Sequence, residues 1–376
     1  MATMTSSPSQ PGTAAAPTKT LLGLELMRFA CALSVLVWHY QHFYYVAGVP
    51  VGFSREAQPW FEWLQPLYHH GFLGVQAFWC LSGFIFFWKY AAPISQARVG
   101  GWRFAVLRFS RLYPLHLLTL LAVAALLALY RQQAGADYVY GHNDAKHFVL
   151  QLFMVSDWGG QGDWSFNGPI WSISIEILAY ALFFALSRLG LTRWWHAAAV
   201  IALTGGLYAF KLTTHPVVLC VFFFYLGGLT QRVHQALPSL AARWRGAALG
   251  AAALAALAGT ALAALDALRP MIYVALLTPA AALLLLAWVH PRSARTARWI
   301  SLLGNTTYAS YLLHFPLQLA LATAVGQPLA ERLPLGSPWW LLGYVAVVFA
   351  LAAIVYRAIE VPAQAWLRAR LMPAKR

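Results

Sequence analysis

Long apolar stretches alternate with short polar segments along most of the chain. Each stretch has 20 or more residues, the length that an α-helix needs to cross the hydrocarbon core of a bilayer. The pattern therefore predicts an all-α integral membrane protein built as a bundle of about ten transmembrane helices. The predicted spans lie near residues 21–46, 69–90, 111–130, 167–188, 194–213, 215–234, 246–266, 270–290, 299–325 and 338–361.

The composition excludes a soluble protein. Hydrophobic residues make up 60% of the 376 positions and charged residues 10%, against roughly 25% charged residues in an ordinary soluble domain. A chain this apolar cannot cover itself with a polar surface. The three cysteines all lie inside apolar stretches and show no disulfide or metal-site spacing, so we predict no metal centre.

The distribution of basic residues predicts the orientation of the helices. The formal net charge is +15. If both ends of the chain are cytoplasmic, 20 of the 26 Lys and Arg residues fall in cytoplasmic segments and 6 in outer segments, as the positive-inside rule requires. This reading explains the charge without a nucleic-acid partner. It predicts a multi-pass protein of the inner (cytoplasmic) membrane, in contact with the lipid bilayer.

The chain divides into three regions by composition. Residues 1–20 are rich in Ser, Thr, Pro and Ala and are predicted to form a disordered cytoplasmic N-terminus. Residues 21–365 form the predicted membrane domain, whose first apolar run is too long for a signal peptide. Residues 366–376 form a predicted basic cytoplasmic tail.

Several ionisable residues lie where lipid is expected, which makes them functional candidates. In the first span, His39 follows Arg28 by eleven residues, a rise of about 16 Å. Glu176 in the fourth span is predicted to lie at a similar depth to His39, and His314 lies near the middle of the ninth span. The alternative for any one histidine is a hydrogen bond between helices, with no role in chemistry.

Two arginines stand at the predicted cytoplasmic boundary. Arg108 and Arg111 are three residues apart, so they share one helical face. Paired guanidinium groups suit phosphate, which they can bind with bidentate hydrogen bonds. The alternative is that they are cytoplasmic loop charges that only fix the topology.

The predicted outer segment 131–168 combines aromatic rings with carboxylates, among them Trp164 and Asp163. Rings beside hydrogen-bonding acids suit a sugar. An interfacial belt of aromatic residues is the equally plain alternative.

Together these segments resemble the acyltransferase-3 family of integral membrane O-acyltransferases, over about residues 21–365. The resemblance is carried by several motifs in order rather than by one. They are Arg28 with His39, FWCLSGFI at 78–85, RFSRLYP at 108–114, WSISIE at 171–176, YASYLLHFP at 308–316 and IEVP at 359–362.

The resemblance implies transfer of an acyl group, most often acetyl, from a cytoplasmic acyl-coenzyme A to a hydroxyl group. The usual acceptors in the family are carbohydrates of surface polysaccharides or glycoconjugates, and some members acylate sugars of secondary metabolites. It also makes the matching positions Trp171, Ser174, Tyr311 and His314 candidates for substrate binding, beside Trp164 and Asp163.

We therefore expect Arg28, Arg108 and Arg111 to hold the phosphates of acyl-coenzyme A, while His39 acts as general base on the acceptor hydroxyl. Glu176 is expected to orient His39 or to bind the acceptor. A covalent acyl-histidine intermediate stays open. The main rival is a transporter or flippase for an acylated or sugar substrate, with the intramembrane His and Glu as a proton relay. A non-catalytic membrane scaffold is the third alternative.

Overall fold

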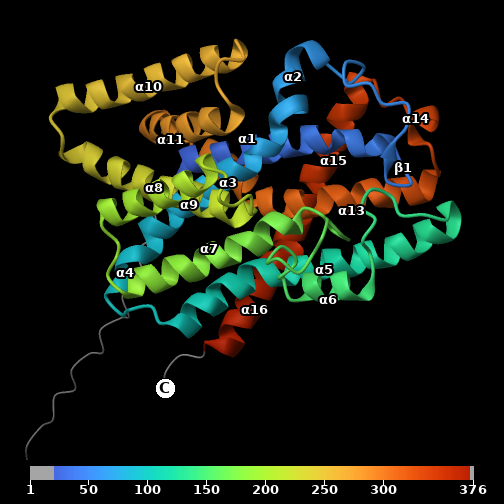
Figure 1. Ribbon diagram of the computed structural model, residues 1–376, viewed down its shortest axis with the longest axis horizontal. Coiled ribbons are helices and arrows are strands. Elements are labelled where there is room, and N and C mark those ends of the chain that lie inside the picture. Colours follow the sequence, from blue (N-terminus) through green and yellow to red (C-terminus); the bar gives the residue numbers. More distant parts are fainter. Residues whose placement is uncertain (1–20, 373–376) are drawn as a thin grey trace, which may run out of the picture.

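The computed structural model describes residues 21–372, so the predicted disordered N-terminus lies outside the described residues. Nearly all regular structure in this range is helical (Figure 1). Eight helical segments are long and apolar enough to cross a membrane. Four of them are single helices: α5 (Gly101–Ala134), α7 (Ile170–Arg188), α10 (Ala242–Ala264) and α11 (Pro270–Trp288). Three combine a helix with short continuations: α1 (Leu22–Trp38) with η1 (His39–Tyr44), α9 (Pro216–Ala236) with η4 (Leu237–Ser239), and α15 (Pro338–Val355) with η5 (Tyr356–Glu360) and α16 (Val361–Leu371). The eighth runs continuously through α2 (Phe61–His70), η2 (Gly71–Leu73), α3 (Gly74–Phe86), η3 (Phe87–Ala91) and α4 (Ala92–Ser95).

The other two predicted spans are also helical. Helix α8 (Trp194–Ala209) has 16 residues, and α12 (Ala294–Asn305) leads into α13 (Thr307–Val325). Helix α13 carries His314, Gln318 and several hydroxyl side chains, which lowers its hydropathy. The all-α membrane architecture is thus confirmed, while the count of ten spans and the cytoplasmic placement of both ends stay predictions.

Helix α5 differs most from its predicted bounds. It begins at Gly101 rather than near residue 111, and it has 34 residues with Pro114 inside it. The sequence pattern treated Pro114 as a helix boundary, but within a membrane bundle neighbouring groups can compensate for a proline in a helix. As a consequence, Arg108 and Arg111 project from a continuous helix and not from a loop.

The predicted outer segment 131–168 contains structure of its own. Helix α6 (Ala145–Leu152) begins where the side chain of Asp144 accepts a hydrogen bond from the backbone N–H of His147, a standard N-cap. The short hairpin of β1 (Tyr45–Val46) and β2 (Val49–Pro50) and helix α14 (Leu329–Arg332) lie at the same end of the molecule (Figure 1).

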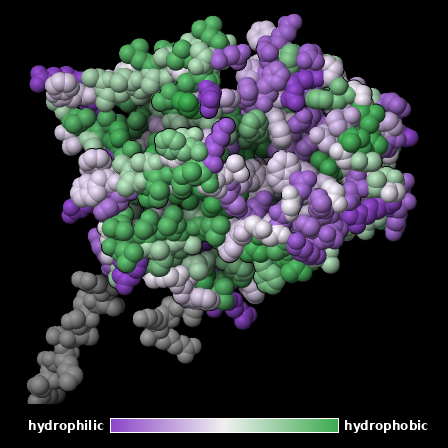
Figure 2. Space-filling model, viewed as in Figure 1, coloured by the Kyte–Doolittle hydropathy of each residue, from purple (hydrophilic) through white to green (hydrophobic). Residues whose placement is uncertain are grey.

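Helix α1 occupies the middle of the bundle, where it contacts α2, α3, α11, α12 and α13. Helix α10 packs against α11 at the edge (Figure 1). Apolar side chains cover the face over α7, α8 and α9, whereas hydrophilic ones gather at the end that carries β1 and α14 (Figure 2). This distribution fits a bundle surrounded by lipid. Arg28 lies on α1, and His39 follows that helix directly as the first residue of η1.

Helices α3 and α9 approach closely because glycines lie at their contact. A Cβ atom added at Gly83 would lie 1.8 Å from the carbonyl oxygen of Phe224, and one added at Gly227 would lie 1.8 Å from that of Cys80. Small residues allow this kind of approach between membrane helices.

We expect Gly227→Ala to lower the melting temperature of the detergent-purified protein markedly. The added methyl group meets backbone rather than a movable side chain, so the cost should exceed the roughly 1–3 kcal/mol of ordinary overpacking. Gly250→Ala on α10 is the matched control, because nothing lies within 4 Å of its added Cβ. Equal melting temperatures for the two variants would contradict the close packing of α3 on α9.

Candidate active site

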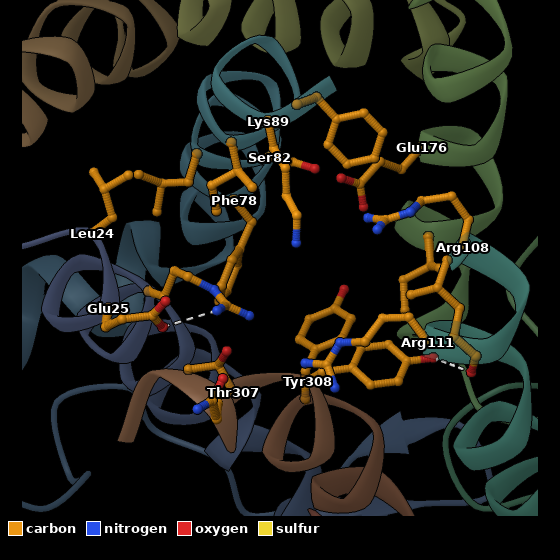
Figure 3. A pocket seen from close by; sticks show the side chains of 18 of the residues that line it. Leu24, Glu25, Phe78, Ser82, Lys89, Arg108, Arg111, Glu176, Thr307 and Tyr308 are labelled. Atoms are coloured by element: carbon orange, nitrogen blue, oxygen red, sulfur yellow. Dashed lines mark hydrogen bonds and ion pairs between the residues drawn. The ribbon is translucent and has the colours of Figure 1, made fainter. Parts of the chain in front are cut away.

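A cavity of about 930 Å³ lies between α1, α3, α5, α7, α12, α13 and α16. Its walls carry more basic than acidic side chains, although most of the surrounding helix surface is apolar. Figure 3 shows Lys89, Arg108 and Arg111 directed toward the same space. The charged residues that line the cavity are Glu25, Arg28, Lys89, Arg108, Arg111, Glu176 and Arg368.

The structure brings the three predicted donor-binding arginines together in this cavity. Arg28 comes from α1, and Arg108 and Arg111 come from α5. Sequence reasoning missed Lys89 and Arg368. Lys89 was visible as a cation near the end of an apolar span, but Arg368 looked like one more charge in a basic tail.

Arg28 is already paired with a carboxylate. Its Nη1 atom lies 2.9 Å from Oε2 of Glu25, one helical turn earlier on α1. Glu25 in turn lies against α12, where a Cβ atom added at Gly304 would fall 1.9 Å from the Glu25 carboxylate. The position of Arg28 in the cavity therefore depends on the packing of α12 against α1.

Arg111 is also paired, with the carboxylate of Glu360 in η5. The Glu360 side chain is 1% exposed and that of Arg111 21% exposed. The guanidinium group also lies over the ring of Tyr308, 5.4 Å from its centre. Arg111 thus ties α5 to the C-terminal part of the chain, a role that the spacing of the two arginines did not predict.

Arg108 is held by aromatic groups. It donates a hydrogen bond of 2.7 Å to the hydroxyl of Tyr90, and its guanidinium lies over the rings of Phe86 and Tyr90. Its Nε atom is buried without a hydrogen-bond partner. Its Nη1 atom makes no hydrogen bond within residues 21–372, so Arg108 keeps donor capacity there that a phosphate can use.

Glu176 lies in the cavity and not beside the imidazole of His39. It interacts with the hydroxyls of Ser82 and Tyr180 and, electrostatically, with Arg108. Figure 3 shows Glu176 and Arg108 pointing toward one another. Matching the two residues by depth along their helices did not fix which way each helix turns its side chains, so the expected pairing of Glu176 with His39 is not what the structure has.

His39 takes its orientation from the backbone instead. Its Nδ1 atom lies 2.9 Å from the carbonyl oxygen of Val35. Because a carbonyl oxygen only accepts, Nδ1 carries the proton and Nε2 is left as the acceptor. Gln318 donates a hydrogen bond of 3.0 Å to the carbonyl oxygen of His39. The neutral imidazole is thus in the tautomer that a general base requires.

His314 packs directly on His39. The ring centres are 4.7 Å apart. His314 is completely buried. Its ring nitrogens make no hydrogen bond of ordinary geometry within residues 21–372, although the backbone groups of Ser310 and Tyr311 interact with the ring. A poorly paired polar group in the interior is costly, so this histidine pair is a second candidate position for chemistry.

Tyr311 lies between the cavity and the histidine pair. It lines the cavity, and its ring centre is 6.0 Å from that of His314. Its hydroxyl is 2.8 Å from Oγ of Ser172, which lines the cavity as well. Neither His39 nor His314 is among the lining residues. The cavity and the histidine pair are therefore neighbours, with the hydrogen-bonded hydroxyl groups of Ser172 and Tyr311 at the wall between them.

Of the remaining residues predicted to bind substrate, two pack inside the bundle and two are exposed at its surface. Trp171 packs edge-on against Trp79 at 5.8 Å, and Ser174 is buried, where its hydroxyl accepts a hydrogen bond from the backbone N–H of Asp157. Trp164 and Asp163 are exposed on the segment that follows α6. Ser174 thus anchors that segment to α7.

The segment also links its surface to the histidines through aromatic rings. Trp164 contacts Tyr140 at 6.2 Å, and Tyr140 lies 5.9 Å from His42. His42 lies 4.9 Å from His39. The exposed Trp164 and the predicted base His39 therefore belong to one connected set of aromatic rings.

The same segment carries Asp157, and burial raises the pKa of its carboxyl group.

Comparison with known proteins agrees with the motifs. Residues 21–357 match the model of the family Acyl_transf_3, described as an acyltransferase domain. A stretch of 189 residues is 28% identical to the Acyltransferase MdmB of Streptomyces mycarofaciens, and it covers 48% of this chain and 44% of that protein. The match thus spans less than half the length of this curated relative. No solved structure matches the chain. Since the family model covers most of the sequence and the chain has several apolar helices of spanning length, the chain belongs to the acyltransferase-3 family of membrane acyltransferases.

Proposed function

We propose that the protein is a membrane O-acyltransferase that moves an acyl group, most simply acetyl, from cytoplasmic acyl-coenzyme A to a hydroxyl of an extracytoplasmic carbohydrate or glycoconjugate. The observation that carries the proposal is the basic cavity beside an oriented imidazole. Arg28 lines the cavity, and His39 lies eleven residues further along the same helix, outside it.

The cavity suits the donor because coenzyme A has a polyanionic end and a long neutral arm. Cations on the walls bind the phosphate groups, and Arg108 suits this role because its Nη1 atom makes no hydrogen bond within residues 21–372. The neutral arm extends past Ser82 and Phe78 toward Ser172 and Tyr311. The thioester then reaches the side of the cavity that adjoins the histidine pair.

The reaction requires one proton acceptor and one leaving group. Nε2 of His39 removes the proton from the acceptor hydroxyl, and the oxygen attacks the thioester carbonyl carbon. The carbon–sulfur bond then breaks, the ester forms, and the imidazolium returns the proton to the departing thiolate. The hydroxyl of Tyr311, which lies 2.8 Å from that of Ser172, can turn its single proton from Ser172 to the developing oxyanion.

The acceptor approaches from the other end. The exposed Trp164 and Asp163 offer a ring face and a carboxylate to a sugar. The rings of Tyr140 and His42 continue from Trp164 to His39. This arrangement supports a carbohydrate acceptor.

The direct test uses purified protein, acetyl-coenzyme A labelled in the acetyl group, and a panel of glycans and glycosylated small molecules. We expect free thiol to appear together with labelled ester. Acceptor movement across proteoliposomes without thiol release would favour a transporter and would overturn the proposal.

Arg108→Ala is expected to raise the donor KM by tenfold or more with little change in melting temperature. The loss corresponds to a charge-assisted hydrogen bond worth about 1.5–3 kcal/mol. Arg108→Lys should restore part of the donor affinity, because an ammonium keeps the positive charge but not the planar pair of N–H donors that a guanidinium offers. Arg103→Ala is the control, since Arg103 is exposed on the same helix and is not part of the cavity wall. A KM that changes equally in both variants would mean that Arg108 acts only through net charge.

A further inference from the structure

Helix α16 brings an additional cation to the cavity. It follows η5 almost without interruption, and Arg368 and Gln364 on it line the cavity. Both residues lie beyond residue 357, where the match to the family model ends. The cavity is therefore completed by a part of the chain that the family model does not cover.

Arg368 is held against α5 by neutral groups. Its Nε donates a hydrogen bond of 3.0 Å to Oγ of Ser110, and its Nη2 donates one of 2.9 Å to Oε1 of Gln364. Trp102 donates a hydrogen bond of 2.9 Å to the carbonyl oxygen of Leu371, at the end of α16. Helix α16 is thus fixed to α5 at two points along its length, and the guanidinium group of Arg368 has a defined position.

The charges of the cavity are unevenly compensated. Glu25 neutralises Arg28, and Glu360 neutralises Arg111. No ion pair joins Lys89, Arg108 or Arg368 to a carboxylate within the range 21–372. Arg108 interacts electrostatically with Glu176 without forming an ion pair. Arg368 also interacts electrostatically with both Arg108 and Arg111. Like charges this close cost free energy unless an anion compensates them.

We propose that Arg368 is a binding residue for the phosphate groups of the acyl-coenzyme A donor, so that α16 forms part of the donor site. This inference rests on the proposed function. A ligand with several negative charges relieves the repulsion between Arg108 and Arg368, which no ion pair within residues 21–372 compensates. The guanidinium keeps unused N–H donors on Nη1 for this ligand, because its hydrogen bonds to Ser110 and Gln364 use only Nε and Nη2.

The test compares two donors on the full-length protein, acetyl-coenzyme A and S-acetyl-pantetheine, which lacks the phosphates. Arg368→Ala should raise KM for acetyl-coenzyme A about tenfold with kcat nearly unchanged. With S-acetyl-pantetheine the ratio of variant to wild-type KM should fall to about one. Arg368→Gln, which keeps a hydrogen-bond donor for Ser110 but no charge, should give the same pattern and guards against misfolding.

Arg370→Ala is the matched control. Arg370 lies on the same helix but is exposed, and its guanidinium lies over the ring of Trp366. If Arg368→Ala raises KM by the same factor with both donors, the residue has a structural role and the inference is overturned. Unchanged KM for acetyl-coenzyme A in both Arg368 variants would overturn it as well. Wild-type protein that neither binds coenzyme A nor releases thiol would instead refute the proposed function, so the two failures are distinguishable.

Discussion

His39→Ala is expected to lower the turnover of acyl transfer by about 10²-fold or more, with coenzyme A binding nearly unchanged. Loss of a general base usually has an effect of this size. Donor binding should survive because His39 is not part of the cavity wall. The measurement is kcat for labelled acetyl transfer, together with coenzyme A affinity and melting temperature on the same sample.

Two further variants sharpen this prediction. His39→Gln should be similarly inactive, because an amide has no basic nitrogen to take up the proton. His70→Ala should be near wild type, since His70 is exposed at the end of α2. A folded, donor-binding His39→Ala protein with near-native transfer would refute His39 as the base, and His314 would become the next candidate.

Arg111→Ala should lower the unfolding free energy by about 3 kcal/mol. The substitution leaves the Glu360 carboxylate, which is 1% exposed, without its ion-pair partner. Removing one member of a buried pair typically costs 3–5 kcal/mol, and the partial exposure of Arg111 places the expected value at the lower end. The measurement is denaturant or thermal unfolding in a fixed detergent.

A double-mutant cycle separates this role from phosphate binding. In the Arg111→Ala background, Glu360→Gln should recover much of the lost stability, because burying a neutral amide costs less than burying an unpaired carboxylate. If instead Arg111→Ala has native stability and only a weaker donor affinity, the arginine serves the ligand and the ion pair is incidental.

The helices could be read from the sequence because length and hydropathy are local properties. All ten predicted apolar stretches fall on helices of the structure. The start of α5 could not be read in this way: the ten residues before the predicted span are too polar to suggest lipid, yet helix α5 already begins at Gly101. Hydropathy reports where a helix meets lipid, while its backbone hydrogen bonds can begin earlier.

The sequence identified part of the cavity wall but not its pairings. The motifs pointed to Arg28, Arg108, Arg111 and Glu176, which line the cavity, and to His39, which does not. Which of them touch depends on helix rotation and on partners far along the chain, such as Glu360, which is 249 residues from Arg111. Depth along the helices gave no information about their rotation. Glu176 was expected to orient His39 or to bind the acceptor, and it lies on the cavity wall with the arginines, without a hydrogen bond to His39 within residues 21–372.

The hydroxyl pair of Ser172 and Tyr311 has a consequence for the membrane itself. An enzyme that takes one substrate from each side of a bilayer is at risk of becoming a leak for protons and small ions. Here Ser172 and Tyr311 form part of the wall of the cation-lined cavity, and His314 beside Tyr311 is completely buried. In the proposed reaction the thioester meets His39 at this wall without a continuous water-filled route, which would let the cell keep its electrochemical gradient.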